Sequence, residues 1–197
     1  MASDIETGRH IVLAFYPDYK EAEKDLQKVM KKDFPLDRVS LLGKASPSGD
    51  DPLGVYYSSV GERMKGWGKQ GAFWGGLWGM ITGAAGLFLL PGVGPVMAAG
   101  PVVEAIIAAA GGASIGGGVL AGAAATSQLS VAIHRMGVPE NEINRTQNLI
   151  NDGYYMLLLV VDDSEATDWR NRLQLNNAEP VMSYPYVGLI DAIREAV

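Results

Sequence analysis

The chain contains 197 residues, carries a formal net charge of −6 at pH 7 and has no cysteine. This length corresponds to one domain with an embellishment, and the acidic balance argues against a general nucleic-acid binder. Without cysteine, disulfides, thiolate metal sites and cysteine nucleophiles are excluded. The two histidines, His10 and His134, lie far apart in the sequence, so we expect neither a multi-histidine metal centre nor a cofactor.

The N-terminal stretch MASDIETGRH is polar and mildly acidic. It lacks the basic segment and the apolar core of a secretory signal. We therefore expect a cytoplasmic protein.

Residues 9–44 predict a β-α-β unit. HIVLAFY, residues 10–16, is rich in β-branched and aromatic residues and predicts a strand. The segment after it places apolar residues at helical spacing, and Asp18 after Pro17 is the expected N-cap. The remaining, charged face of residues 20–32 is interpreted as solvent-exposed. DRVSLLGK, residues 37–44, predicts a second strand, and the turn-rich residues 45–62 predict a loop.

Residues 153–186 predict a second β-α-β unit. YYMLLLVVD, residues 154–162, is continuously apolar, as expected for a central strand of a sheet. Residues 164–175 predict a helix capped by Ser164, and EPVMSYPYV predicts an edge strand interrupted by Pro185. Residues 187–197 would form a final helix or tail. Two β-α-β halves predict an α+β, ferredoxin-like domain, with residues 63–152 inserted between them.

The inserted region is strongly apolar, because residues 70–134 contain one charged residue, Glu104, and fifteen of the 25 glycines. Residues 72–90 predict a first helix, about 28 Å long at 1.5 Å per residue. PGVGP, residues 91–95, interrupts it, and a second helix is expected from Pro101 to about residue 133. These two antiparallel helices would form a hairpin, followed by a further helix that begins near Pro139 and ends at Gly153.

Glycines recur at four-residue spacing along both predicted arms. Each glycine inside a helix costs roughly 0.5–1 kcal/mol relative to alanine, so the rows need an offsetting role. Rows of small residues let helix backbones approach closely. The residues expected to pack helices and to drive oligomerisation are Gly71, Gly75, Gly79, Gly83, Gly112, Gly116, Gly118 and Gly122.

Exposing this hairpin to water would be very unfavourable. About 1000 Å² of apolar surface on each arm would cost about 25 kcal/mol, against a typical domain stability of roughly 5–15 kcal/mol. The hairpin is therefore expected either in a bilayer or in the buried core of a soluble homo-oligomer. Basic and tryptophan residues flank it as at a membrane interface, with both ends in the cytoplasm. These candidate interface or subunit-contact residues are Arg63, Lys65, Lys69, Arg135, Trp67, Trp74 and Trp78.

Glu104 is the sole acidic residue of the apolar region. A carboxylate at membrane depth would be a candidate ion or proton site, which would make the protein a small channel-like oligomer. The position also falls in the first turn after Pro101, where a carboxylate interacts favourably with the helix N-terminus. We favour this structural interpretation.

Two short motif matches are interpreted as coincidental. GWGKQG, residues 66–71, matches the dinucleotide fingerprint, but no strand precedes it and no acidic residue follows about twenty positions later. GASIG, residues 112–116, matches a nucleophile elbow, but it lies within a predicted helix rich in glycine and alanine. No nucleophile can be paired with a base, so we expect no enzymatic activity.

The middle of the chain resembles a bacterial family of general stress or heat-induced stress proteins. The shared pattern is LLPGVGPVMAAGP, an Ala/Gly-rich helix, MGVPENEI and the strand NDGYYMLLLVV. The resemblance covers roughly residues 10–162 and is most specific over residues 86–162. It implies a cytoplasmic ferredoxin-like domain that carries a glycine-zipper hairpin, in proteins linked to stress and without an established enzymatic activity.

The expected function is therefore non-enzymatic. The sequence predicts a stress-associated protein that self-assembles through its glycine-rich hairpin and is anchored in the inner membrane from the cytoplasmic side. The expected partners are further copies of the chain and the lipid bilayer, and no nucleic acid. A soluble homo-oligomer with the hairpins in its core and a channel-like oligomer that uses Glu104 are the alternatives, and a ligand-sensing module is a further one.

Overall fold

The computed structural model describes residues 8–44, 85–90, 93–111 and 128–187. These residues form an α+β structure, which confirms the predicted class. The elements are β1 (Arg9–Tyr16), α1 (Tyr19–Met30), the short 3₁₀ helix η1 (Leu36–Arg38), β2 (Val39–Lys44), β3 (Ala85–Leu90), β4 (Gly94–Ala99), α4 (Pro101–Gly111), α5 (Gln128–Arg135), α6 (Glu140–Asn151), β5 (Tyr155–Asp162), α7 (Asp163–Leu175) and β6 (Val181–Pro185).

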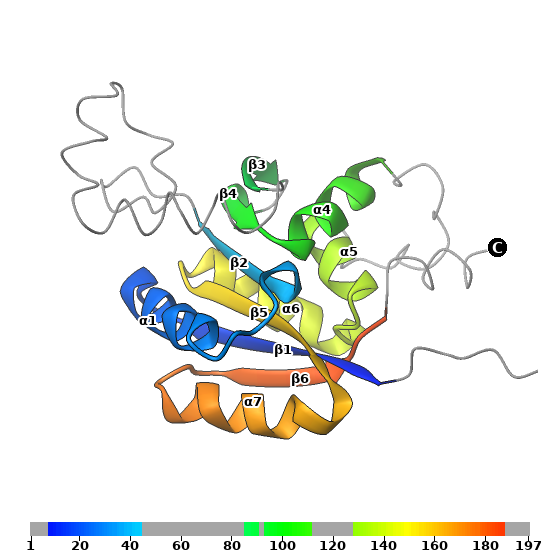
Figure 1. Ribbon diagram of the computed structural model, residues 1–197. Helices are drawn as coiled ribbons and strands as arrows, with labels where there is room; N and C mark the ends of the chain where they lie inside the picture. The colour runs from blue at the N-terminus through cyan, green and yellow to red at the C-terminus, as the bar shows by residue number, and fades with distance from the viewer. Residues whose placement is uncertain (1–7, 45–84, 91–92, 112–127, 188–197) are drawn as a thin grey trace, which may run out of the picture.

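The strands form one six-stranded sheet in the order β3-β4-β2-β5-β1-β6 (Figure 1). Every neighbouring pair is antiparallel. β5 pairs with both β1 and β2 and so joins the N-terminal and C-terminal parts of the chain. β6 lies at one edge, as predicted for the strand that ends at Pro185.

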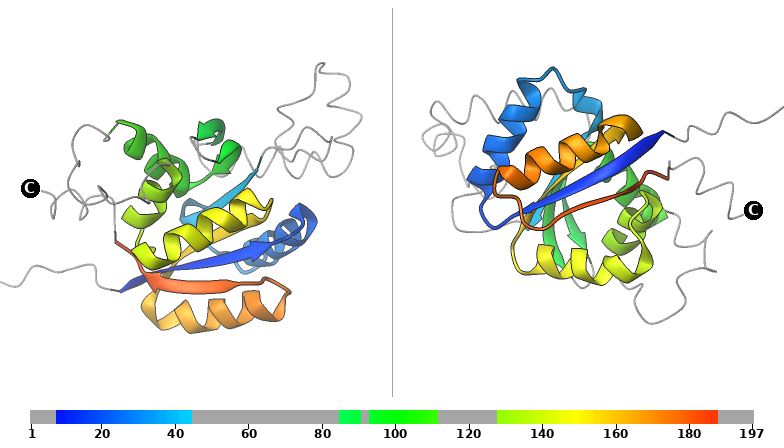
Figure 2. Two further views of the ribbon diagram at one scale, coloured as in Figure 1. Left: turned by 180° about the vertical axis from the view of Figure 1, so that it is seen from behind. Right: turned by 90° about the horizontal axis from the view of Figure 1, so that it is seen from below.

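Helices cover both faces of the sheet (Figures 1 and 2). The helices α1 and α7 pack on one face, and α4, α5 and α6 pack on the other. Alternate residues of β5 enter the two cores: Leu157 and Leu159 face α1 and α7, whereas Met156 and Leu158 face the other three helices. Burial on both faces explains why this strand is continuously apolar.

Several local predictions are confirmed. The carboxylate of Asp18 caps α1 by accepting a hydrogen bond from the Lys20 amide at 2.8 Å. Pro101 is the first residue of α4, and Gly153 follows α6 with φ +92°. The prediction that Ser164 caps α7 is wrong, because β5 leads directly into the helix at Asp163, whose amide donates to the Gly8 carbonyl.

The first predicted helical arm, residues 72–90, is wrong in its described part. Residues 85–90 form β3, which pairs with β4 from Ala85↔Ala99 to Leu90↔Gly94. The strands β3 and β4 therefore form an antiparallel β-ladder where the sequence predicted the break between two helices. The physical reason is non-local: β4 also pairs with β2, so this ladder satisfies the backbone groups along an otherwise open strand.

The second predicted arm, residues 101–133, is helical at both ends, as α4 and α5. Residues 112–127 lie outside the described residues, as do 45–84 and nearly all of the predicted tail. The apolar side chains of α4, among them Val102, Val103 and Ile106, are buried against the sheet and α5 within the same chain. Of the large apolar side chains described on this helix, Ile107 is exposed, at 57%.

This packing corrects the energetic argument made from the sequence. From the sequence, the apolar middle of the chain was expected to be buried either in a bilayer or in an oligomer core. For α4 and α5, the second face of the chain's own sheet performs this burial. Among the helices described, none has both the length and the apolar character needed to cross a bilayer.

The start of α4 is fixed to β2 by two contacts. The Ser40 hydroxyl, fully buried, accepts a hydrogen bond from the Val102 amide at 3.0 Å. Gly100, between β4 and α4, has φ +85°, and a Cβ built there would overlap the Val39 carbonyl oxygen. The glycine is thus required both by its conformation and by the closeness of β2.

We expect Gly100→Ala to lower the free energy of unfolding by well over 1 kcal/mol, because alanine meets both an unfavourable φ and a backbone clash. Gly94→Ala is the matched control: Gly94 has a similar φ of +92°, but a Cβ there has no neighbour within 4 Å. Urea denaturation of both variants separates the clash from the φ cost. Equal losses in the two variants would contradict the proposed contact with β2.

Candidate functional site

Of the residues predicted to carry function, the structure describes only Glu104 and Arg135. The rest of the predicted set lies outside the described residues. These residues are Arg63, Lys65, Trp67, Lys69, Gly71, Trp74, Gly75, Trp78, Gly79, Gly83, Gly112, Gly116, Gly118 and Gly122.

Glu104 lies in the first turn of α4, and its side chain is exposed. A carboxylate there interacts favourably with the partial positive charge of the helix N-terminus. Arg135 lies in the last turn of α5, where a cation interacts favourably with the opposite end of the dipole. Both positions fit structural roles. Within the described ranges, no three His, Asp or Glu side chains are grouped so that they could hold a metal ion.

A buried polar cluster connects α1 to β1. The Tyr16 hydroxyl donates a hydrogen bond to Asp25 Oδ2 at 2.8 Å, and Lys28 Nζ donates to Asp25 Oδ1 at 2.9 Å. Asp25 is 1% exposed and lies on the same helix face as Ala22 and Val29. Both carboxylate oxygens therefore have a donor, as a buried carboxylate requires.

The electrostatics of this cluster keep Tyr16 protonated. Burial raises the pKa of the Tyr16 hydroxyl far above its usual range, and the negative charge of Asp25 and its hydrogen bond raise it further. The half-exposed Lys28, whose side chain is 41% exposed, supplies the positive charge that compensates the buried Asp25 carboxylate. The cluster therefore connects α1 to β1 through polar groups that satisfy one another.

A shallow cavity of about 350 Å³ lies between the end of α1 and α7. Its charged groups are partly satisfied by one another: Arg172 lies 2.9 Å from Asp168, and its guanidinium lies over the Trp169 ring at 5.5 Å from the centroid. Phe34 packs edge-on against the same ring, at 5.1 Å between centroids. The residues that line the cavity are Lys32, Asp33, Glu165, Asp168, Trp169 and Arg172.

The burial of acidic residues in α1 was not predicted from the sequence. The charged face of residues 20–32 was expected to be solvent-exposed, whereas Glu23 and Asp25 are both buried. A signal was present, because Asp25 is three residues after Ala22 and four before Val29, on the apolar stripe of the helix. Its partner Tyr16 lies on the preceding strand, and helical spacing within α1 could not identify it.

Comparisons of the chain with protein-family models, curated proteins and solved structures gave no match.

We expect Tyr16→Phe to lower the free energy of unfolding by about 1–3 kcal/mol, because the buried Asp25 carboxylate loses one of its two donors. Tyr184→Phe is the control, since that half-buried hydroxyl donates to the Met182 sulfur at 3.3 Å and to no carboxylate among the described residues. Its expected loss is within about 0.5 kcal/mol. Urea denaturation at neutral pH compares the two variants with the unaltered protein, and equal losses would contradict the role of the cluster.

An alkaline series tests whether the Tyr16 hydroxyl is buried in its protonated form beside Asp25. Tyr16 holds its proton more tightly in the folded than in the unfolded chain, so its stabilising contribution is complete below the unfolded pKa of about 10. The contribution is lost as the pH rises above that value towards the folded pKa. The stability of the unaltered protein should therefore fall more steeply above about pH 10 than that of Tyr16→Phe.

Proposed function

We propose that this protein is a non-catalytic, self-associating protein that acts at the cytoplasmic face of the inner membrane. The observation that carries the proposal is where the folded domain joins the glycine-rich segments. Residues 45–84 join β2 to β3, and residues 112–127 join α4 to α5. β3 and β4 form one edge of the sheet, α4 follows β4 directly, and α4 packs on α5.

Both glycine-rich segments are therefore tethered to the same half of the domain. β3, β4, α4 and α5 gather at one end, and β6 and α7 lie at the opposite end (Figures 1 and 2). We propose that the glycine rows of these segments pack against the same rows of a second copy. Their close backbone approach would offset the conformational cost of the glycines.

The proposed membrane contact lies at the bilayer surface. Because β3 includes residues 85–90, only residues 72–84 of the first predicted arm are left for a bilayer. As a helix, these thirteen residues would extend about 20 Å, short of the roughly 30 Å hydrocarbon core. We therefore propose attachment at the interface in place of a spanning hairpin. Arg63, Lys65 and Lys69 would lie at the headgroups, and the three nearby tryptophans would lie just below them.

A soluble assembly is the second candidate. It is favoured by the burial of α4 and α5 against their own sheet, which already removes much apolar surface from water. In this alternative, the glycine rows pack subunit against subunit without lipid. A protein that self-associates but does not sediment with membranes would support this alternative over the first proposal.

We also propose a finer fold assignment. The strands β2-β5-β1-β6, with α1 and α7 on one face, would be a ferredoxin-like unit. Their order, their antiparallel pairing and the two β-α-β connections support it. β3, β4, α4, α5 and α6 would then be an insertion that widens the sheet and covers its second face. The resemblance of residues 86–162 to bacterial stress proteins is the ground for proposing a role under stress.

We expect Gly79→Leu to reduce the assembly towards the 20.9 kDa monomer, because a leucine would fill the groove between helices. Size-exclusion chromatography with light scattering measures the mass. Gly8→Leu is the control, since a Cβ at Gly8 has no neighbour within 4 Å. Thermal unfolding should show the domain intact in both variants. An unchanged mass for Gly79→Leu would contradict self-association through this row.

Membrane fractionation tests the proposed location. After expression without detergent, we expect the full chain to sediment with membranes in a high-speed spin and to be released by alkaline carbonate, as a surface-bound protein is. Retention after carbonate would instead indicate insertion through the bilayer. Recovery of high-mass protein in the supernatant would support the soluble assembly.

A further inference from the structure

The charges of α1 are balanced in sequence but not on the surface. Residues 19–30 contain three lysines and three acidic residues. Folding buries two of the acids, Glu23 and Asp25, on the side that faces the sheet. The solvent-facing side of the helix is therefore mostly basic, although the chain as a whole carries a net charge of −6.

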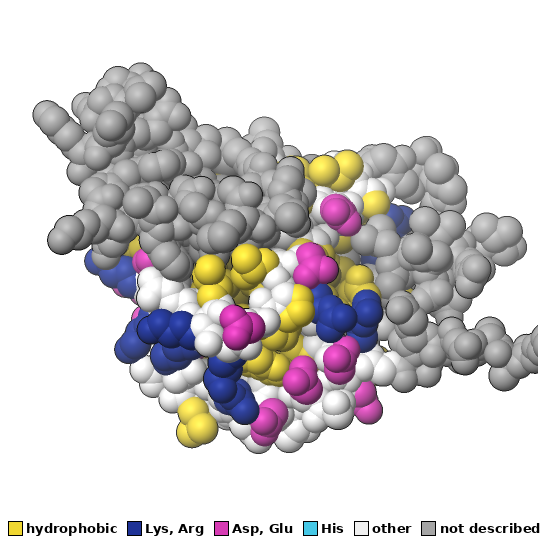
Figure 3. Space-filling model, viewed as in Figure 1, with side chains coloured by type: hydrophobic (Ala, Val, Ile, Leu, Met, Phe, Trp, Pro, Cys, Tyr) yellow, Lys and Arg dark blue, Asp and Glu magenta, His cyan; other side chains and the backbone are white. Residues whose placement is uncertain are grey.

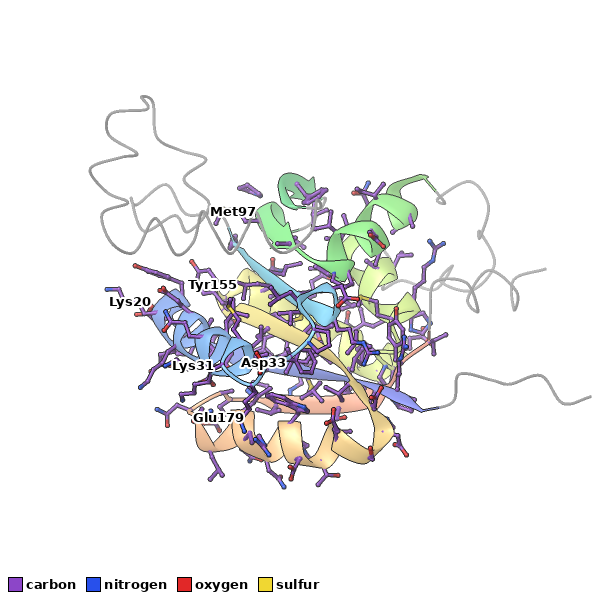
Figure 4. All side chains as sticks on the ribbon, viewed as in Figure 1. Lys20, Lys31, Asp33, Met97, Tyr155 and Glu179 are labelled. Atoms are coloured by element: carbon purple, nitrogen blue, oxygen red, sulfur yellow. The ribbon has the colours of Figure 1, made fainter. Side chains whose placement is uncertain are left out.

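Three exposed lysines, Lys20, Lys24 and Lys31, share this side with the half-exposed Lys28, and the four are called here the lysine face. At 3.6 residues per turn, their directions fall within about 80° of one another, and the row is about 16 Å long. Lys20 and Lys31 lie at its two ends (Figure 4). Lys and Arg side chains gather over α1 on the surface (Figure 3).

Acidic neighbours neutralise little of this face. Asp25 pairs with Lys28 from the buried side, and Glu23 accepts a hydrogen bond from Gln27 at 3.3 Å. Among the described residues, Lys20, Lys24 and Lys31 form no ion pair. The other acidic residues between positions 18 and 33 are the half-buried Glu21 and, at the two ends of the row, the N-cap Asp18 and Asp33.

We infer that the lysine face binds the anionic headgroups of a phospholipid bilayer. A one-sided, linear row of ammonium groups can meet many phosphates of a planar surface at once. The inference deepens the proposed membrane attachment and rests on it for a second, apolar contact. Each lysine near an anionic surface contributes about a fivefold gain in binding, so the face alone holds the protein weakly and reversibly.

Two observations favour a bilayer over a nucleic acid as the partner. The net charge of −6 repels a polyanion that would approach more than this one face. The chain also places basic residues and tryptophans beside the apolar run of residues 72–84, a composition typical of the bilayer interface.

Vesicle flotation of the full chain tests the inference. Binding is measured to vesicles of phosphatidylcholine alone and to vesicles in which one third of the lipid is phosphatidylglycerol. The unaltered protein should prefer the anionic vesicles, and Lys20→Gln with Lys24→Gln should reduce that preference about 25-fold. High salt should remove the preference in the unaltered protein.

Two control variants separate the lysine face from net charge. Asn144→Asp with Arg145→Gln also changes the net charge by −2, but on exposed residues of α6, on the other face of the sheet. This variant should keep the preference, as should Lys20→Arg with Lys24→Arg. Equal losses in the glutamine pair and the α6 pair would overturn the inference.

The two vesicle types also distinguish this inference from the proposed function. Binding to neutral vesicles reports the apolar attachment, and the ratio of anionic to neutral binding reports the lysine face. Equal binding to both vesicles would overturn the lysine face alone, whereas binding to neither would overturn both proposals. Tighter binding to duplex DNA than to anionic vesicles at the same salt would replace the bilayer with a nucleic acid.

Discussion

The fold depends on the burial of β5 on both of its faces. Residues 156–161 of this strand are all buried, so the sheet needs a helical layer on each side. The two β-α-β halves supply α1 and α7 for one face only. The second layer comes from α4, α5 and α6, which lie in the apolar middle of the chain. That region is thus part of the domain's own core as well as a source of glycine-rich segments.

The elements determined by local pattern were predictable from the sequence. β1, α1, β5 and α7 follow from short-range periodicity. Asp18 marks the start of α1 and Pro101 the start of α4, because capping and the fixed φ of proline act locally. β3 was not predictable in this way. Its sequence AGLFLL suits a helix or a strand, and pairing through β4 to the distant β2 decides between them. The same limit applies to the site, since one of the two donors to the buried Asp25 carboxylate is Tyr16 on β1.

Net charge and surface charge diverge in this protein. An acidic chain presents a basic helix face because the fold uses two of the acidic residues of α1 internally, with Tyr16, Lys28 and Gln27 as their partners. The net charge of the whole chain therefore does not give the sign of the charge on one face. The relevant quantity is the set of charges that remain exposed after the buried pairs have been removed.

The strand order has a consequence for how the chain is synthesised. β1 pairs with β5 and β6, and its nearest pairing, Tyr16↔Tyr155, joins residues separated by 139 positions (155 − 16). At roughly 5–20 residues per second, translation reaches Tyr155 about 7–28 s after Tyr16. By then β2, β3 and β4 have already been synthesised, and they can form their own ladder. Completion of the sheet is therefore a late step, and the apolar middle emerges before β5 is available to cover it.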